Sequence, residues 1–309
     1  MGAPKQSEET RFHYGGQAVI EGVMMRGLRS MAVAVREPEG GIRVKLEMLT
    51  GLYTGPIRRI PLLRGVIVLW ETLALGMRAL AFSSQVAAGM SDEEEDESSP
   101  AYIWGVMAFA FAFAAALFFV TPLLLTAWLN SRIDNGTIVV AIEGLLRLGM
   151  LLGYIWGIGL IPDIKRVFAY HGAEHRTINA WEADEPLEVE SVRRFGNEHA
   201  RCGTAFLLTV ALVSLFVFLL LPTPGWWWRV ASRVLLMPVI AAASYEIIRL
   251  SAEFRRFRVV RWLSQPSLTL QSLTTRDPDD TQIEVAIRAL ETVLAADTSA
   301  PIDGAAGTP

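Results

Sequence analysis

Four residues with the chemistry of zinc ligands lie close together in one polar stretch of the chain. The sequence His-Gly-Ala-Glu-His occupies residues 171–175, and His199 and Cys202 follow before the next long apolar segment. The chain has four histidines and one cysteine, so this stretch holds most of the residues able to supply imidazole or thiolate. Those two groups together form a ligand set that zinc prefers. We therefore predict a zinc site made by His171, His175, His199 and Cys202.

A helix that begins at residues 162–163 would place the first two histidines on one face. His171 and His175 are four residues apart, and a proline at the first turn suits a helix start. Glu174 is close enough to polarise a metal-bound water, and the order His-x-x-Glu-His matches the inverted zincin motif. Glu246, which is expected at the same membrane face, is a further candidate ligand.

The number of ligands decides what such a site can do. If all four residues bind, the zinc is closed and structural. If Cys202 stays out, three ligands leave room for a water whose pKa zinc lowers to about 7, with Glu174 as general base. Without a metal, His171 and His199 would bond carboxylates or the backbone, and Cys202 would be a small buried apolar side chain. The sequence leaves these three interpretations open.

The composition is typical of a polytopic membrane protein. Hydrophobic residues make up 52% of the chain and charged residues 19%, and the mean hydropathy is +0.34. The lipid bilayer is therefore a predicted partner. Nucleic acid is not, because the net charge is −4 and no basic patch is interleaved with aromatic residues. Residues 1–30 show no signal-peptide pattern, and a lone cysteine cannot form an internal disulfide.

Four apolar segments are long enough to cross a hydrocarbon core of about 30 Å. They are residues 102–129, 137–161, 205–222 and 226–248. In the second, Glu143 and Arg147 are four residues apart and can pair on one helix face. Basic residues gather in 162–204 and after residue 248, so the positive-inside rule places the His-rich loop and both termini in the cytoplasm. We predict a multi-pass protein of the plasma membrane.

The segment 61–82 complicates the count of spans. It is apolar, but Arg64, Glu71 and Arg78 recur every seven residues and would line one side of a helix. We favour an amphipathic or re-entrant helix in the interface, or packed against the bundle, over a fifth span. Residues 83–101 include the acidic run SDEEEDESSP and are expected to be a solvated linker.

Smaller elements are predicted outside the membrane. Residues 31–36 and 42–48 alternate apolar and polar side chains around a Gly-Gly turn, which indicates a β-hairpin. The glycine-rich stretch 15–27 favours a structural turn and strand over substrate contact. A capping box at Thr281–Glu284 starts a helix whose apolar stripe needs a partner surface. That stripe consists of Ile283, Ala286, Ile287, Leu290 and Leu294.

The predicted fold class is mainly α: a polytopic helical membrane protein with about four transmembrane helices, one amphipathic or re-entrant helix and a small cytoplasmic β-hairpin region. The predicted divisions are an N-terminal region with β-structure (1–60), the amphipathic helix (61–82), the acidic linker (83–101), transmembrane helices 1–2 (102–161), the His-rich loop (162–204), transmembrane helices 3–4 (205–248), a C-terminal region with an amphipathic helix (249–295) and a disordered tail (296–309).

Four segments of the chain resemble the YqhQ-like family of bacterial membrane proteins. They are GGQAVIEGVMMRG at 15–27, HGAEH at 171–175, HARCGTAF at 199–206 and LTTRDPDDTQIEVAI at 273–287. The family is described as predicted metal-dependent enzymes, so the resemblance, which spans nearly the whole chain, implies one here. Family members commonly have Pro where this chain has Ala200 and Lys where it has Arg176, and neither difference touches a predicted ligand.

We therefore predict an integral membrane metal-dependent hydrolase, with zinc at the cytoplasmic face held by His171, His175 and either His199 or Cys202. The alternative is a non-catalytic membrane scaffold or assembly factor with a structural zinc. A transporter is a third class, because charges within spans mark transport paths, but only Glu143 and Arg147 lie deep enough. The sequence names no substrate, and it leaves open a membrane-protein partner or a second copy of the chain.

Overall fold

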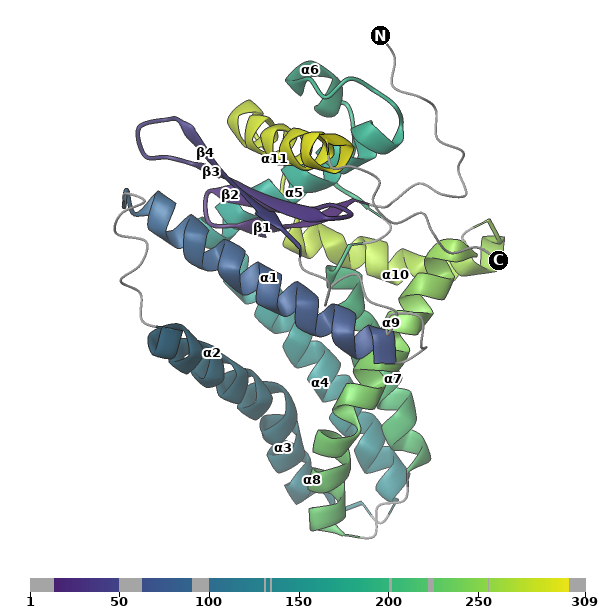
Figure 1. Cartoon of the computed structure of the whole chain (residues 1–309). Helices are drawn as coiled ribbons and strands as arrows, with labels where there is room; N and C mark the ends of the chain where they lie inside the picture. Colours follow the sequence, from purple (N-terminus) through teal and green to yellow (C-terminus); the bar gives the residue numbers. More distant parts are fainter. Residues whose placement is uncertain are drawn as a thin grey trace, which may run out of the picture.

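A small β-sheet covered by helices lies at one end of the molecule, and long apolar helices extend from it (Figure 1). The computed structural model describes residues 14–49, 63–90, 100–130, 132–133, 135–199, 202–221, 225–254 and 256–299. The strands are β1 (Gly15–Val19), β2 (Gly22–Arg26), β3 (Ser30–Arg36) and β4 (Ile42–Met48). The helices are α1 (Leu63–Ala87), α2 (Pro100–Ala115), the π-helix η5 (Ala116–Val120), α3 (Thr121–Asn130), α4 (Gly136–Ile158), α5 (Pro162–Glu182), α6 (Val189–Val192), α7 (Thr204–Leu220), α8 (Trp226–Leu235), α9 (Met237–Glu253), α10 (Arg258–Thr274) and α11 (Asp280–Ser299).

The sheet is an antiparallel meander in the order β1-β2-β3-β4. The predicted hairpin is confirmed, since Arg36 pairs with Ile42 and Ser30 with Met48. The glycine-rich stretch forms a second hairpin, β1–β2, in the structural role favoured for it. Glu21, in the turn of that hairpin, has a φ of 51°, which a non-glycine residue adopts in tight turns.

Both faces of the sheet are buried. Because successive strand residues point to opposite faces, Met24, Val33 and Val35 pack on α1 while Val23, Met25 and Ala34 pack on α5 and α11. The apolar stripe predicted for the C-terminal helix finds its partner surface here, since Ile283, Ala286 and Leu290 are fully buried against the sheet. Helices on both sides explain why Val23–Met25 of β2 and Met31–Val35 of β3 are continuously apolar rather than alternating.

The charged side of α1 faces the rest of the protein. Arg64 pairs with Glu246 of α9, Glu71 with Arg26 of β2, and Arg78 with Glu47 of β4. These partners account for the seven-residue spacing of the three charges. Helix α1 packs along the sheet, yet its residues 64–87 are also apolar and long enough to cross a membrane. It continues five residues past the predicted boundary at 82; residues 91–99 of the expected acidic linker lie outside the described residues.

The chain is mostly helical, and three or four of its helices are compatible with a membrane protein. Three helical stretches, Arg64–Ala87, Ala108–Leu129 and Gly136–Ile158, are long and apolar enough to span. A fourth candidate joins α8 and α9 across a 43° bend. Pro238, in the first turn of α9, lacks a backbone N–H and suits this break in the predicted span 226–248. Helix α7 is a shorter apolar helix of 17 residues.

Helix α11 begins at a reciprocal cap. Asp279 Oδ1 accepts a hydrogen bond from the Gln282 backbone N–H (2.9 Å), and Gln282 Oε1 accepts one from the Asp279 N–H (3.0 Å). The cap is two residues earlier than the predicted one at Thr281, and the helix continues to Ser299, past the predicted boundary at 295. Burial opposes ionisation of Asp279, but hydrogen bonds from Thr281 and Gln282 outweigh it and lower the pKa of this carboxyl.

We predict that Asp279→Ala destabilises the chain by about 1 kcal/mol, the typical cost of losing a side-chain cap. Thermal unfolding of the detergent-solubilised protein, followed by circular dichroism, measures it. Glu291→Ala removes the same charge from an exposed position of the same helix and should change the midpoint little. The folded-state pKa of Asp279 is lowered, so its stabilisation is present above the unfolded pKa and fades as the pH falls through the folded pKa. A difference that persists unchanged into strong acid would contradict this account.

Candidate metal centre

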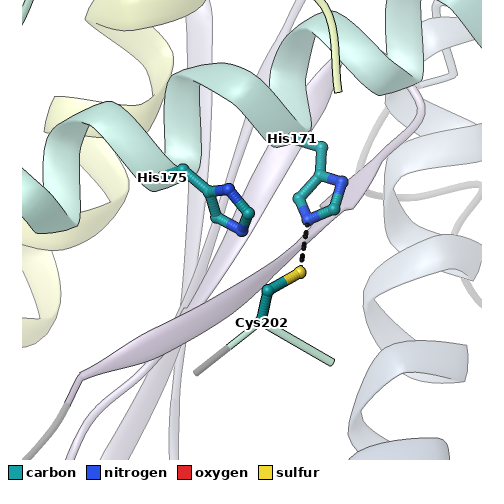
Figure 2. A group of neighbouring side chains, drawn as sticks. All are labelled: His171, His175 and Cys202. Carbon is teal, nitrogen blue, oxygen red and sulfur yellow. Dashed lines mark hydrogen bonds between the residues drawn. The ribbon is translucent and has the colours of Figure 1, made fainter. Parts of the chain in front are cut away.

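Three potential metal ligands converge where helix α5 passes the start of α7. One ligand atom from each of His171, His175 and Cys202 lies within 4.8 Å of the others. The two histidines project from the same face of α5 toward the cysteine, as Figure 2 shows. Helix α5 begins with Pro162 at its first turn, as predicted, so the four-residue spacing places both rings side by side, with centroids 4.4 Å apart. These three side chains could hold a metal ion.

Backbone carbonyls fix the tautomer of both histidines. His171 Nδ1 lies 2.8 Å from the Thr274 carbonyl, and His175 Nδ1 contacts the Asn197 carbonyl. A carbonyl oxygen can only accept, so each Nδ1 carries a proton, and in the neutral ring Nε2 is then the nitrogen with the lone pair. His171 Nε2 lies 3.2 Å from Cys202 Sγ. Metal-binding histidines are oriented in this way, with the second ring nitrogen donating to a carbonyl or carboxylate.

The cysteine sulfur is buried at the beginning of α7. Cys202 Sγ lies 3.1 Å from Thr204 Oγ1 and 3.4 Å from the Thr204 backbone nitrogen, and the cysteine is 6% exposed. A thiolate can accept both of these hydrogen bonds. The first backbone N–H groups of a helix have no partner within the helix, so the N-terminus of α7 favours a negative charge on the Cys202 sulfur. The sulfur is therefore placed as a ligand and shielded from solvent.

His199 lies beside the cluster but outside the three-atom group. Its backbone is clamped by the buried side chain of Gln271, which bonds both the His199 N–H and carbonyl at 2.9 Å. Its ring centroid is 5.5 Å from that of His175. Its Nε2 is buried and has no hydrogen-bond partner among the described residues, and a carboxylate oxygen of Glu182 is 3.6 Å away. The structure thus places Cys202 with the first two histidines and leaves His199 adjacent.

Two other predicted site residues are bonded elsewhere. Glu174 is 4% exposed, and its Oε1 accepts a hydrogen bond from the Gly16 backbone N–H of β1 at 2.9 Å. It ties α5 to the sheet and is not part of the group of ligand atoms. Glu246 pairs with Arg64, between α9 and α1. The roles predicted for both residues stay predictions.

Supporting residues that the sequence reasoning missed come mainly from α10 and the loop before α7. They are Gln271 and Thr274, which hold His199 and His171, and Asn197, which holds His175. Arg176 in turn donates to Asn197 Oδ1 at 2.7 Å and pairs with Asp277. Of these residues, only Thr274 lies in a segment that the sequence singled out, the family-like stretch 273–287. The contacts to His171 and His175 are made by backbone carbonyls, which every residue type has, so residue types could not predict them.

The fold and the site define a mainly helical protein with three or four helices able to cross a membrane and a His-His-Cys cluster able to hold a metal ion. The chain belongs to the family described as "Protein of unknown function (DUF1385)", which matches residues 60–296. It is 38% identical over 293 residues to the "Uncharacterized protein YqhQ" of Bacillus subtilis (strain 168), covering 91% of this chain and 92% of that relative. The YqhQ-like resemblance is thereby confirmed. No solved structure matches the chain.

We predict that Gly172→Ala disrupts the metal centre. A Cβ at Gly172 would meet the Arg276 carbonyl oxygen at 2.2 Å, so α5 must move away from the segment that holds His171. We expect about 1–3 kcal/mol of destabilisation, the usual cost of overpacking, together with reduced metal content. Gly203→Ala is the matched control: it lies beside Cys202, and its Cβ would have nothing within 4 Å. Equal metal content in both variants would argue against this contact as the positioning element.

Proposed function

We propose that this chain is an integral membrane zinc hydrolase whose metal centre is formed by His171, His175 and Cys202. The observation that carries the proposal is the fixed tautomer of the two histidines, which leaves both Nε2 lone pairs available beside one sulfur. Two imidazoles and one thiolate suit zinc, and three protein ligands are the usual number at a catalytic zinc site. Zinc held there would supply a polarised water at its remaining position.

Two side chains compete for the role of general base. A base must come within hydrogen-bond reach of the proton that it takes. Glu174 already accepts from Gly16, whereas His199 Nε2 is buried without a partner next to the His175 ring. Glu182, 3.6 Å from that nitrogen, is placed to stabilise a protonated imidazole. These contacts support His199 as the base and Glu174 as the residue that positions α5.

An apolar cavity supports a substrate with a hydrocarbon part. It has a volume of about 370 Å³ and lies between α7, α9 and α10. Its walls include Leu208, Leu212, Phe216, Ile247 and Leu263. Gln271, which clamps the His199 backbone, also lines it. An apolar chain in this cavity would therefore be separated by one side chain, Gln271, from His199.

The second candidate function is a membrane scaffold with a closed structural zinc. The unpartnered Nε2 of His199 favours it, because a shift of this ring toward the cluster would complete a four-ligand set. The two functions differ in what His199 does. In the hydrolase it transfers a proton and is dispensable for metal; in the scaffold it is a ligand.

We predict about one zinc per purified chain, and that His171→Ala and Cys202→Ser each abolish stoichiometric zinc, since two ligands hold zinc poorly. Elemental analysis of the detergent-purified variants measures this. His199→Gln should keep the wild-type zinc content if the site is catalytic, because His199 is then no ligand, and should retain less zinc if the site is structural, because one of four ligands is then missing. Wild-type protein without zinc after purification in chelator-free buffer would defeat both functions.

Activity separates the two candidate bases. With a panel of fluorogenic esters and amides as probes, the variant that lacks the base should keep zinc while hydrolysis falls by about 100-fold or more. We expect that outcome for His199→Gln, and a smaller effect for Glu174→Gln. The reverse order would return the general-base role to Glu174. No hydrolysis of any probe by zinc-loaded wild type would favour the scaffold.

The membrane assignment has its own test. The apolar helices support insertion in the plasma membrane, and the basic residues at the sheet end favour the cytoplasmic face for the metal centre and both termini. We predict that alkaline carbonate leaves the chain in the membrane pellet. We also predict that a protease added outside intact spheroplasts does not cleave a tag at either terminus. Release by carbonate, or cleavage of a tag at either end, would contradict the proposed arrangement.

A further inference from the structure

A second charged cluster lies inside the helical bundle, apart from the metal centre. Glu143 of α4 is 1% exposed, and three arginines surround it, each at most 5% exposed. They are Arg147, Arg229 and Arg233. The Glu143–Arg147 pair expected from the sequence is present at 3.0 Å. The two arginines of α8 join it, Arg229 at 2.8 Å and Arg233 at 3.2 Å.

The cluster carries more positive charge than its own acid can balance. An arginine side chain stays protonated in proteins, so three arginines and one glutamate sum to two positive charges. Both oxygens of Glu143 already accept two hydrogen bonds each. Glu143 is the only acid that bonds to these arginines within the described ranges. Arg229 Nε is buried and has no hydrogen-bond partner in the part of the chain that the structure describes.

The neighbours of the cluster hold the guanidinium groups without neutralising them. Arg233 lies over the Phe218 ring at 4.5 Å, and Arg147 lies over Phe119 at 5.3 Å. Arg147 Nε also donates to the Phe118 carbonyl, within the π-helix η5. Cation–π contacts orient an arginine but supply no countercharge. Short π-helical turns are frequent at functional sites, where they present backbone groups that an α-helix would use internally.

The cluster lies near the end of the bundle that is farthest from the sheet. Glu143 is seven residues, or about 10 Å, from the start of α4, and the other end of α4 leads into α5 with its histidines. Arg229 directly follows Trp227 and Trp228, which are 81% and 49% exposed. Exposed tryptophans favour the level of lipid headgroups. Figure 1 shows α8 at this far end.

We infer that Arg147, Arg229 and Arg233 form a binding site for a phosphate-type oxyanion at the end of the bundle opposite the metal centre. Arginine forks match phosphate oxygens in geometry and charge, and the unpartnered Arg229 Nε is a donor ready for one of them. The phosphate belongs to a lipid headgroup or to a free phosphate. The site itself needs no zinc; the lipid source rests on the membrane insertion proposed above.

The test is titration of full-length protein, purified in non-ionic detergent and phosphate-free buffer, with inorganic phosphate and separately with dihexanoyl phosphatidic acid. Isothermal calorimetry measures affinity. Losing a hydrogen bond to a charged group should weaken binding about 10- to 100-fold in Arg229→Gln. Arg194→Gln removes the same charge from an exposed position and should bind as wild type does. Binding of inorganic phosphate would show that a free oxyanion is enough to occupy the site. Binding of the phosphatidic acid without binding of phosphate would show that the ligand is a lipid headgroup.

A second variant, Glu143→Gln, tests the inference even if Arg229→Gln fails to fold. It raises the net charge of the cluster by one, so phosphate should bind it at least as tightly as wild type and should raise its thermal midpoint. A cluster that only braces the helices predicts no response to phosphate in any variant. Absence of binding to both probes, or equal binding by wild type and Arg229→Gln, overturns the inference. Zinc content measured on the same samples shows separately whether the metal centre is intact.

Discussion

The hydrogen bond from His171 Nδ1 to the Thr274 carbonyl determines how the candidate metal centre is built. It fixes the proton on one ring nitrogen, turns the other toward Cys202, and joins α5 to the end of α10. Gly172 allows this approach because it has no side chain to meet the Arg276 carbonyl. Glu174, three residues after His171, also holds α5 through its bond to β1. The sheet and α10 therefore act together as a clamp on the helix that carries both histidines.

Several charged residues in this molecule join its layers to one another. The three charges of α1 bind β2, β4 and α9, and they attach the helix to the sheet and to the bundle at once. The pair between Arg166 and Glu21 likewise ties the first hairpin to α5. Hydrogen bonding to Glu21 raises the pKa of Arg166, as expected for a cation held by a carboxylate. Surface ion pairs of this kind add little stability individually, but they set the orientation of the layers.

Local patterns in the sequence predicted the elements well. The β3–β4 hairpin, the start of α5 at Pro162 and the Glu143–Arg147 pair each follow from spacing within a few residues. Contacts between distant segments were not predictable in this way. The periodicity of the sequence could not predict that Arg229 and Arg233 contact Glu143, or that Glu174 accepts from the Gly16 backbone. Both contacts depend on how distant elements pack. The break between α8 and α9 was not predicted, because the mean hydropathy of the segment 226–248 is high enough for one span despite Pro238.

The partners of the two histidines are spread widely along the chain, and this has a consequence for the order of events during synthesis. Cys202 follows His171 by 31 residues, and Thr274 follows it by 103. An emerging chain thus carries the histidines long before it carries the carbonyl that fixes the tautomer of His171. Before α10 has docked, His171 is free to rotate and to present either nitrogen. Under the proposed function, metal acquisition is therefore expected late, after translation of α10, when the candidate ligands have become a single rigid group.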